Sequence, residues 1–110
     1  MSRALTENSV EQALDFLART EQEFANAVGL KAVIDDMQKI ALSREFLTAE
    51  GKSVADRDAA ARVTPSYGEA VKKTQDAYEH EALMRAKRLR YEATIEVWRT
   101  QEASRRRGNV

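Results

Sequence analysis

The sequence of 110 residues has no cysteine, one proline and four glycines. Without cysteine it can form no disulfide, thiolate metal site or cysteine nucleophile. Only 6% of the residues are aromatic and 33% are charged, a composition more typical of long solvated helices than of compact α/β or all-β domains. No stretch approaches the roughly 18 apolar residues of a membrane span, and the amino terminus lacks a signal-peptide pattern. We therefore expect one helical domain over residues 1–110, cytoplasmic and with no membrane partner.

The charges balance at eighteen of each sign, but they are unevenly distributed along the chain. Acidic residues are in excess over residues 1–64, and basic residues are in excess over residues 65–110. From Arg85 onward, eight basic residues accompany three acidic ones. The carboxyl-terminal quarter is therefore distinctly basic, and basic surfaces attract phosphate groups.

The spacing of apolar residues predicts a first long helix over residues 9–49. Asn8 or Ser9 can cap its amino end. Gly29 lies in the middle, where a glycine costs about 1 kcal/mol relative to alanine. The apolar stripe also changes phase after this glycine. We therefore expect a single helix that bends near Gly29.

A short link is expected to connect this helix to a second long one. Gly51 suits the left-handed position that often ends a helix, and Ser53 can cap a connecting helix over residues 53–63. Pro65 is suited to the first turn of a helix over residues 65–107. The expected fold is all-α: an antiparallel hairpin of two long helices with a short connecting helix, similar to a coiled coil.

The second long helix carries apolar residues on two opposite sides, whereas a surface helix needs one apolar stripe. One side can pack on the first helix and the other on a second copy of the chain. A two-helix hairpin also buries little apolar area by itself. We therefore predict a homodimer or a higher oligomer, with an interface that includes Met84, Tyr91, Ile95 and Trp98.

No motif in the chain indicates catalysis. Gly51-Lys52-Ser53 matches the end of a phosphate-binding loop, but the rest of that motif is missing and a helical pattern precedes it where a strand is required. His80 has Asp76 one turn before it, and two ligands do not make a metal site. A helix end and a solvated helical face explain these features. We expect a protein that is not an enzyme and has no catalytic residue, cofactor or metal.

The strongest functional signal is a basic cluster in the second long helix, interleaved with Tyr91 and Trp98. Basic side chains attract phosphate, and exposed aromatic rings can stack on unpaired bases. The alternative is a solvated helix end, because the helix dipole favours cations there and the two rings at heptad spacing also suit an interface. The candidate nucleic-acid-binding residues are Arg85, Lys87, Arg88, Arg90, Tyr91, Arg99, Arg105, Arg106 and Arg107.

Three short segments follow one another in the chain: Thr-Ala-Glu-Gly-Lys-Ser at 48–53, Pro-Ser-Tyr at 65–67 and Val-Trp-Arg-Thr-Gln-Glu-Ala-Ser-Arg at 97–105. In this order they resemble small helical proteins of bacteriophages and prophages that often accompany recombination functions. The resemblance implies an accessory protein in the cytoplasm of a bacterial host, without a catalytic site. We therefore expect an oligomeric adaptor that binds a protein partner in DNA recombination or replication. The alternative is a protein that binds single-stranded or duplex DNA directly through the basic cluster.

Overall fold

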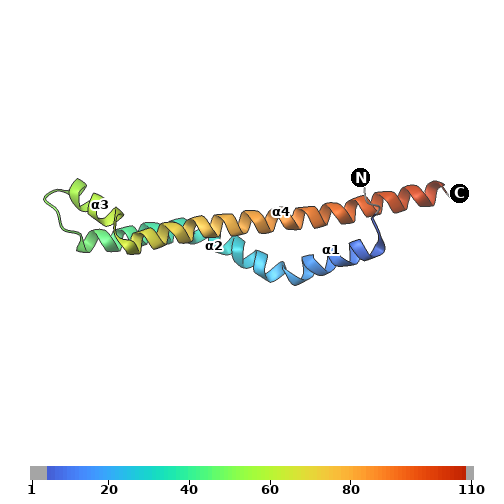
Figure 1. The fold of residues 1–110 in the computed structure, drawn as a ribbon, viewed down its shortest axis with the longest axis horizontal. Coiled ribbons are helices and arrows are strands. Elements are labelled where there is room, and N and C mark those ends of the chain that lie inside the picture. The colour runs from blue at the N-terminus through green and yellow to red at the C-terminus, as the bar shows by residue number, and fades with distance from the viewer. Residues whose placement is uncertain (1–4, 109–110) are drawn as a thin grey trace. The chain divides into compact units, whose positions relative to one another are not determined.

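The computed structural model describes residues 5–108, which form four helices and no strand. α1 spans Glu7–Arg19, α2 spans Glu21–Thr48, α3 spans Val54–Arg62 and α4 spans Pro65–Gly108 (Figure 1). α1 and α2 together form the first arm of the hairpin, α3 is the connecting helix and α4 is the second arm. The expected all-α hairpin of long helices with a short connecting helix is confirmed.

The helices form two compact units. One contains the described residues up to Ala25 together with those from Ala82 onward, and the other is Asn26–Glu81. In the first unit, α1 and the start of α2 pack antiparallel on the carboxyl-terminal half of α4. In the second unit, the rest of α2 packs antiparallel on the amino-terminal half of α4 and is followed by α3. α2 and α4 therefore contribute to both units.

The first arm is interrupted at Thr20, and α2 runs through Gly29 without a break. The bend expected near Gly29 stays a prediction. The buried Thr20 hydroxyl donates to the Phe16 carbonyl at 2.7 Å, and its amide donates to the same carbonyl at 3.0 Å. Three threonines of α4 bond back in the same way within an uninterrupted helix, so this bond alone does not end α1. Gly29 lies within α2, because its lower helix propensity does not by itself break a packed helix. The single helix expected over residues 9–49 is therefore two helices.

The amino ends of α1 and α3 have side-chain caps. Ser53 caps α3 as expected, and its hydroxyl accepts the Asp56 amide at 3.1 Å. The cap of α1 is Thr6, whose hydroxyl accepts the Ser9 amide at 3.2 Å, so the expected cap at Asn8 or Ser9 is corrected. Each cap satisfies an amide that has no partner within its helix.

Gly51 does not have the left-handed conformation expected of it, since no described glycine has a positive φ. It is needed because the chain is crowded there: a Cβ at Gly51 would lie 2.9 Å from the Asp56 Cβ and 3.0 Å from the Arg57 amide nitrogen. The Arg57 side chain is held in place because it donates to the Ala49 carbonyl at 3.3 Å and covers the Phe46 ring at 4.8 Å. Glycine is therefore needed at position 51 because a side chain would not fit there, and not because the backbone has a positive φ.

Replacing Gly29 and Gly51 by alanine should change stability in opposite directions. A Cβ at Gly29 meets nothing within 4 Å, so Gly29→Ala should raise the free energy of unfolding by about 1 kcal/mol through helix propensity. Gly51→Ala forces the link away from α3, and we expect the free energy of unfolding to fall by about 1–3 kcal/mol. Urea unfolding followed by circular dichroism measures both changes. A stabilising Gly51→Ala would contradict the crowding at the link.

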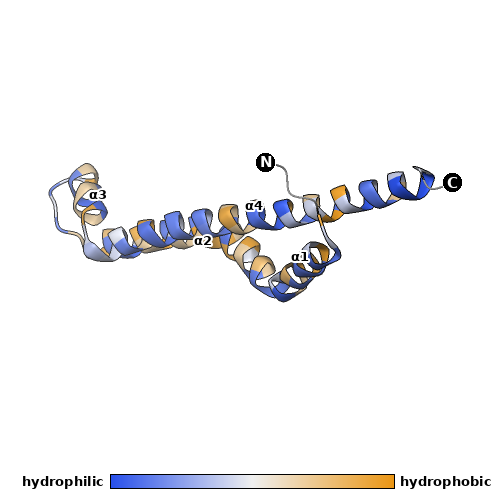
Figure 2. Cartoon of the chain, turned by 45° about the vertical axis from the view of Figure 1, so that its right-hand side comes forward, coloured by the Kyte–Doolittle hydropathy of each residue, from blue (hydrophilic) through white to orange (hydrophobic). Residues whose placement is uncertain are grey.

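The buried core of each unit is made largely of small side chains. The first unit buries Ala13, Thr20 and Met84, and the second buries Ala27, Ile34, Ala61, Ala77 and Glu81. Alanines allow the helices to approach closely but remove little apolar area from water. Many larger apolar side chains stay exposed. Figure 2 shows hydrophobic positions along α1 and α2, whereas the last turns of α4 are hydrophilic.

Candidate interaction surfaces

Arg88, a candidate for phosphate binding, forms hydrogen bonds to the carboxyl end of α1. Its guanidinium donates to the Leu17 carbonyl at 2.9 Å and to the Thr20 hydroxyl at 2.7 Å, and it lies 5.1 Å from the centre of the Phe24 ring. The last carbonyls of a helix have no intrahelical partner, so Arg88 supplies hydrogen bonds that the interruption at Thr20 requires. This arginine is part of the fold of the first unit.

Three further candidates contact aromatic rings of the first arm. Arg85 lies 5.3 Å from the centre of the Phe24 ring, and the Lys87 ammonium lies 5.6 Å from the centre of the Phe16 ring. Tyr91 is half-buried and stacks on Phe16, with 4.4 Å between ring centres. Cation–π contacts of this kind contribute about 0.5–1 kcal/mol at exposed sites. The Tyr91 ring would have to leave Phe16 before it could stack on a base.

Near the carboxyl end of α4, two arginines are paired within the helix. Arg99 donates to the Glu96 carboxylate at 2.9 Å, and Arg105 donates to the Glu102 carboxylate at 2.7 Å. The hydrogen bond from Arg105 holds the pKa of Glu102 below its usual value. Exposed pairs of this kind contribute little to stability and exchange readily with solvent. They reduce the positive charge of the helix end without cancelling it.

Three exposed arginines form no ion pair within residues 5–108: Arg90, Arg106 and Arg107. Arg106 is nevertheless near enough to Glu102 for its charge to help lower the pKa of that carboxyl. Arg107 donates to the Ala103 carbonyl at 3.4 Å, which leaves its charge uncompensated. These side chains can meet a phosphate without breaking an ion pair. They are the part of the basic cluster that remains available for an external partner.

The candidate interface residues lie on the face of α4 that packs on the first arm of the same chain. Met84 is buried, and Tyr91, Ile95 and Trp98 are half-buried. In this order they are seven, four and three residues apart, which places them on one stripe of the helix. Much of this stripe is covered within one chain, and its role between copies stays a prediction.

Polar side chains of α2 and α4 contact one another in the second unit. Glu81 is only 2% exposed, and its carboxylate lies 3.2 Å from the Lys31 ammonium. Lys31 also lies 5.1 Å from the centre of the Tyr78 ring. The Tyr78 hydroxyl donates to the Asp35 carboxylate at 2.5 Å, and this hydrogen bond raises the pKa of Tyr78. These contacts fix the register of α2 against α4.

One side of the second unit is open and apolar. Four large side chains of α2 are between 43% and 51% exposed and recur at intervals of three and four residues, so they form one stripe. We call this stripe the open strip; it consists of Leu30, Val33, Met37 and Ile40. The apolar pattern of the sequence does not distinguish these exposed residues from the buried stripe of the same helix.

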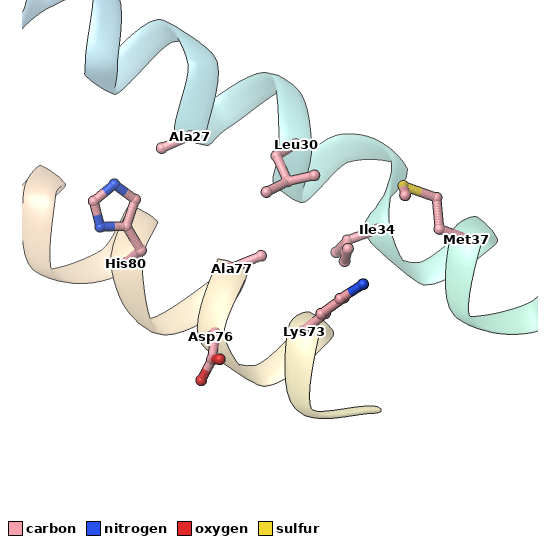
Figure 3. Close-up of a pocket in the computed structure, with 8 residues that line it drawn as sticks. All are labelled: Ala27, Leu30, Ile34, Met37, Lys73, Asp76, Ala77 and His80. Carbon is pink, nitrogen blue, oxygen red and sulfur yellow. The ribbon is translucent and has the colours of Figure 1, made fainter. Parts of the chain in front are cut away.

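A groove of about 330 Å³ runs beside the open strip, between α2 and α4. Its lining residues are Ala27, Leu30, Ile34 and Met37 from α2, with Lys73, Asp76, Ala77 and His80 from α4 (Figure 3). The α2 wall is apolar, and the α4 wall is polar apart from Ala77. In Figure 3 the Asp76 carboxylate points away from α2. Asp76 is exposed, so its carboxylate is accessible to another molecule.

The described residues were also compared with the requirements of metal sites, membrane spans and catalytic sites. Within the described residues, no group of three or more His, Asp or Glu side chains could hold a metal ion. None of the described helices combines the length and the apolar character needed to cross a membrane. His80 and Asp76 lie on the wall of the groove and not in a catalytic arrangement.

Comparison of the chain with protein-family models, with curated proteins and with solved structures gives no match. The open strip, the groove beside it and the basic end of α4 are therefore the features from which a function has to be inferred.

Proposed function

We propose that the chain is a non-enzymatic helical adaptor that works as an oligomer and binds a protein partner. The observation that carries the proposal is the open strip, in which four large apolar side chains are about half exposed along one side of α2. Contiguous apolar patches on small proteins often mark interaction sites. A partner helix can cover such a stripe because residues three and four positions apart lie on one helical face.

The cellular setting rests on the resemblance to phage and prophage proteins at 48–53, 65–67 and 97–105. It supports a role beside DNA recombination or replication, in the cytoplasm of a bacterial host. The adaptor would connect copies of itself to a protein of that process. No residue of the chain is assigned a catalytic role.

The second candidate function is direct binding of DNA by the basic end of α4. It is favoured by Arg90, Arg106 and Arg107, which are exposed and form no ion pair in the described range. The contacts of Arg88 and Tyr91 weigh against it, because these two residues already bind the first arm. We place the adaptor first for this reason.

Affinity capture from the bacterial host, with and without nuclease treatment, should separate the two functions. An adaptor should retain a specific protein after nuclease treatment and lose it when Val33→Asp places a charge in the open strip. A DNA-binding protein should lose its captured material on nuclease treatment, and also in the double variant Arg106→Ala with Arg107→Ala.

Titration with labelled oligonucleotides gives the quantitative form of this test. The adaptor should show no binding at micromolar concentration in low salt. If three arginines contact phosphates, the log–log slope of affinity against salt should be about −2 to −3, since each contact contributes about −0.9 on duplex and −0.7 on single strands. Lys39→Ala, which removes an exposed cation from α2, is the matched control and should leave any slope unchanged. Salt-dependent binding that is lost with Arg106 and Arg107 would favour DNA binding over the adaptor.

A further inference from the structure

We propose that a second copy of this chain covers the open strip, in an antiparallel two-fold arrangement that packs α2 on α2 and α4 on α4. The inference rests on the proposed function, because it names one partner of the surface that carries that function. Three features of the second unit support it. The open strip lies on a side of α2 that a second copy can cover, the exposed charges of α4 beside the groove can pair between copies, and one two-fold axis relates both contacts.

The open strip lies about a quarter of the way around α2 from Ile34, on a wheel of about 100° per residue. Ile34 is buried and marks the side of α2 that packs on α4. A helix that packs on one neighbour and presents a second apolar stripe a quarter turn away has the geometry of a four-helix bundle, where each helix contacts two neighbours. Two hairpins stacked on their open sides produce such a bundle.

The open strip is self-complementary when two copies of α2 lie antiparallel. About a point midway between Met37 and Ile40, Met37 of one copy meets Ile40 of the other. Leu30 then meets Leu47 of the second copy, which is 75% exposed in the single chain. Val33 meets Arg44 of the second copy, which is exposed and whose aliphatic stem can cover an apolar side chain while its guanidinium stays in water. The pairs of Met37 with Ile40 and of Leu30 with Leu47 are apolar on both sides. Closed symmetric dimers use one surface patch twice in this way.

The polar wall of the groove has the charge order that the same arrangement needs. Lys73 and Asp76 are exposed on one side of α4. When two copies of α4 lie antiparallel about the point midway between these residues, each Lys73 meets the second copy's Asp76. Glu69, one turn before Lys73, then meets the second copy's His80. A parallel pair of α4 helices would bring like charges together.

One two-fold axis serves both contacts. Asp35 on α2 lies opposite Tyr78 on α4, as their hydrogen bond shows. Three to four residues further along α2 is the midpoint of the Met37–Ile40 contact. The same distance back along α4 is the midpoint between Lys73 and Asp76. The apolar contact and the charged contact are thus centred at one level of the hairpin.

Other two-fold arrangements fit less well. An axis parallel to the helices would place the open strip of one copy against the Lys73 and Asp76 wall of the other. Apolar side chains would then cover charged groups, and the charges would lose water without gaining a partner. The antiparallel arrangement is the one that pairs apolar with apolar and acid with base.

Charge reversal followed by mixing tests the arrangement. Lys73→Asp creates a wall with two acids, and Asp76→Lys creates a wall with two lysines. Each variant alone should dimerise about tenfold or more weakly than the wild type, because like charges meet across the axis. An equimolar mixture should recover dimer formation, because opposite charges meet. An effect on the helix within one chain cannot produce recovery on mixing alone, so failure to recover would overturn the arrangement.

Ile40→Asp tests the apolar contact. Ile40 is half exposed in the single chain, so helix content by circular dichroism should be unchanged while sedimentation shows a monomer. Leu89→Asp is the matched control: Leu89 is exposed on another side of α4, and its variant should remain a dimer. A monomeric wild type at micromolar concentration, or a dimeric Ile40→Asp variant, would overturn the proposal. A monomer that still captures a host protein through the open strip would overturn the second copy and leave the adaptor function intact.

Discussion

Lys31→Met should lower the free energy of unfolding by about 2–3 kcal/mol, and adding Glu81→Leu should restore most of that loss. Glu81 is almost completely buried, and the Lys31 ammonium lies 3.2 Å from its carboxylate. Removing one partner of a buried ion pair costs about 3–5 kcal/mol when the remaining charge has no other partner. Glu81 has a further interaction besides Lys31, which reduces this cost. Lys31 is itself 39% exposed, so water compensates part of the loss and the cost falls below that range.

The double variant is expected to recover because an apolar pair needs no compensation. Replacing both members of a buried ion pair by apolar residues is often neutral or stabilising. Urea unfolding of the wild type, both single variants and the double variant gives the interaction energy directly. Lys39→Met, an exposed lysine of the same helix, is the control and should change stability little. An unchanged Lys31→Met variant would show that the Glu81 carboxylate does not depend on Lys31.

The second large effect is expected at Arg88. Arg88→Met should destabilise the chain by about 2–4 kcal/mol, since hydrogen bonds from a charged donor contribute about 1.5–3 kcal/mol each and Arg88 makes two to the end of α1. Arg88→Lys keeps the positive charge but cannot reproduce the planar fork, so we expect it to lose much of the same stability. Thermal unfolding measures both variants.

The lysine variant separates a structural role for Arg88 from a role in phosphate binding. A residue that mainly attracts phosphate should tolerate lysine, whereas a residue that bonds the Leu17 carbonyl and the Thr20 hydroxyl should not. Arg90→Met is the matched control, because Arg90 is exposed on the same helix two residues away. Equal stability of the Arg88→Met and Arg90→Met variants would contradict the structural role.

The starts of α3 and α4 could be predicted from the local sequence, because each depends on near neighbours. Ser53 caps α3 and Pro65 is the first residue of α4, as the pattern indicates. At the interruption, Thr20 accepts a hydrogen bond from Arg88, which is 68 positions away in the sequence. A contact of that range leaves no local signal. Crowding at Gly51 likewise comes from the return of the chain through α3.

The open strip shows a different limit of sequence reasoning. The apolar phase changes after Gly29, although α2 is one continuous helix there. The residues after Gly29 belong to two stripes, a buried one that contains Ile34 and an exposed one that contains Met37. A periodic pattern shows that apolar residues share a side of a helix. It does not show which of two sides the rest of the chain covers.

The division into two units makes the only tryptophan a local reporter. Trp98 is half-buried in the first unit, and the second unit contains no tryptophan. Its fluorescence emission therefore follows the first unit alone, while far-ultraviolet circular dichroism follows the helices of both. Coincident melting curves from the two signals would mean that the units unfold in one cooperative transition, and separate curves would resolve their individual stabilities.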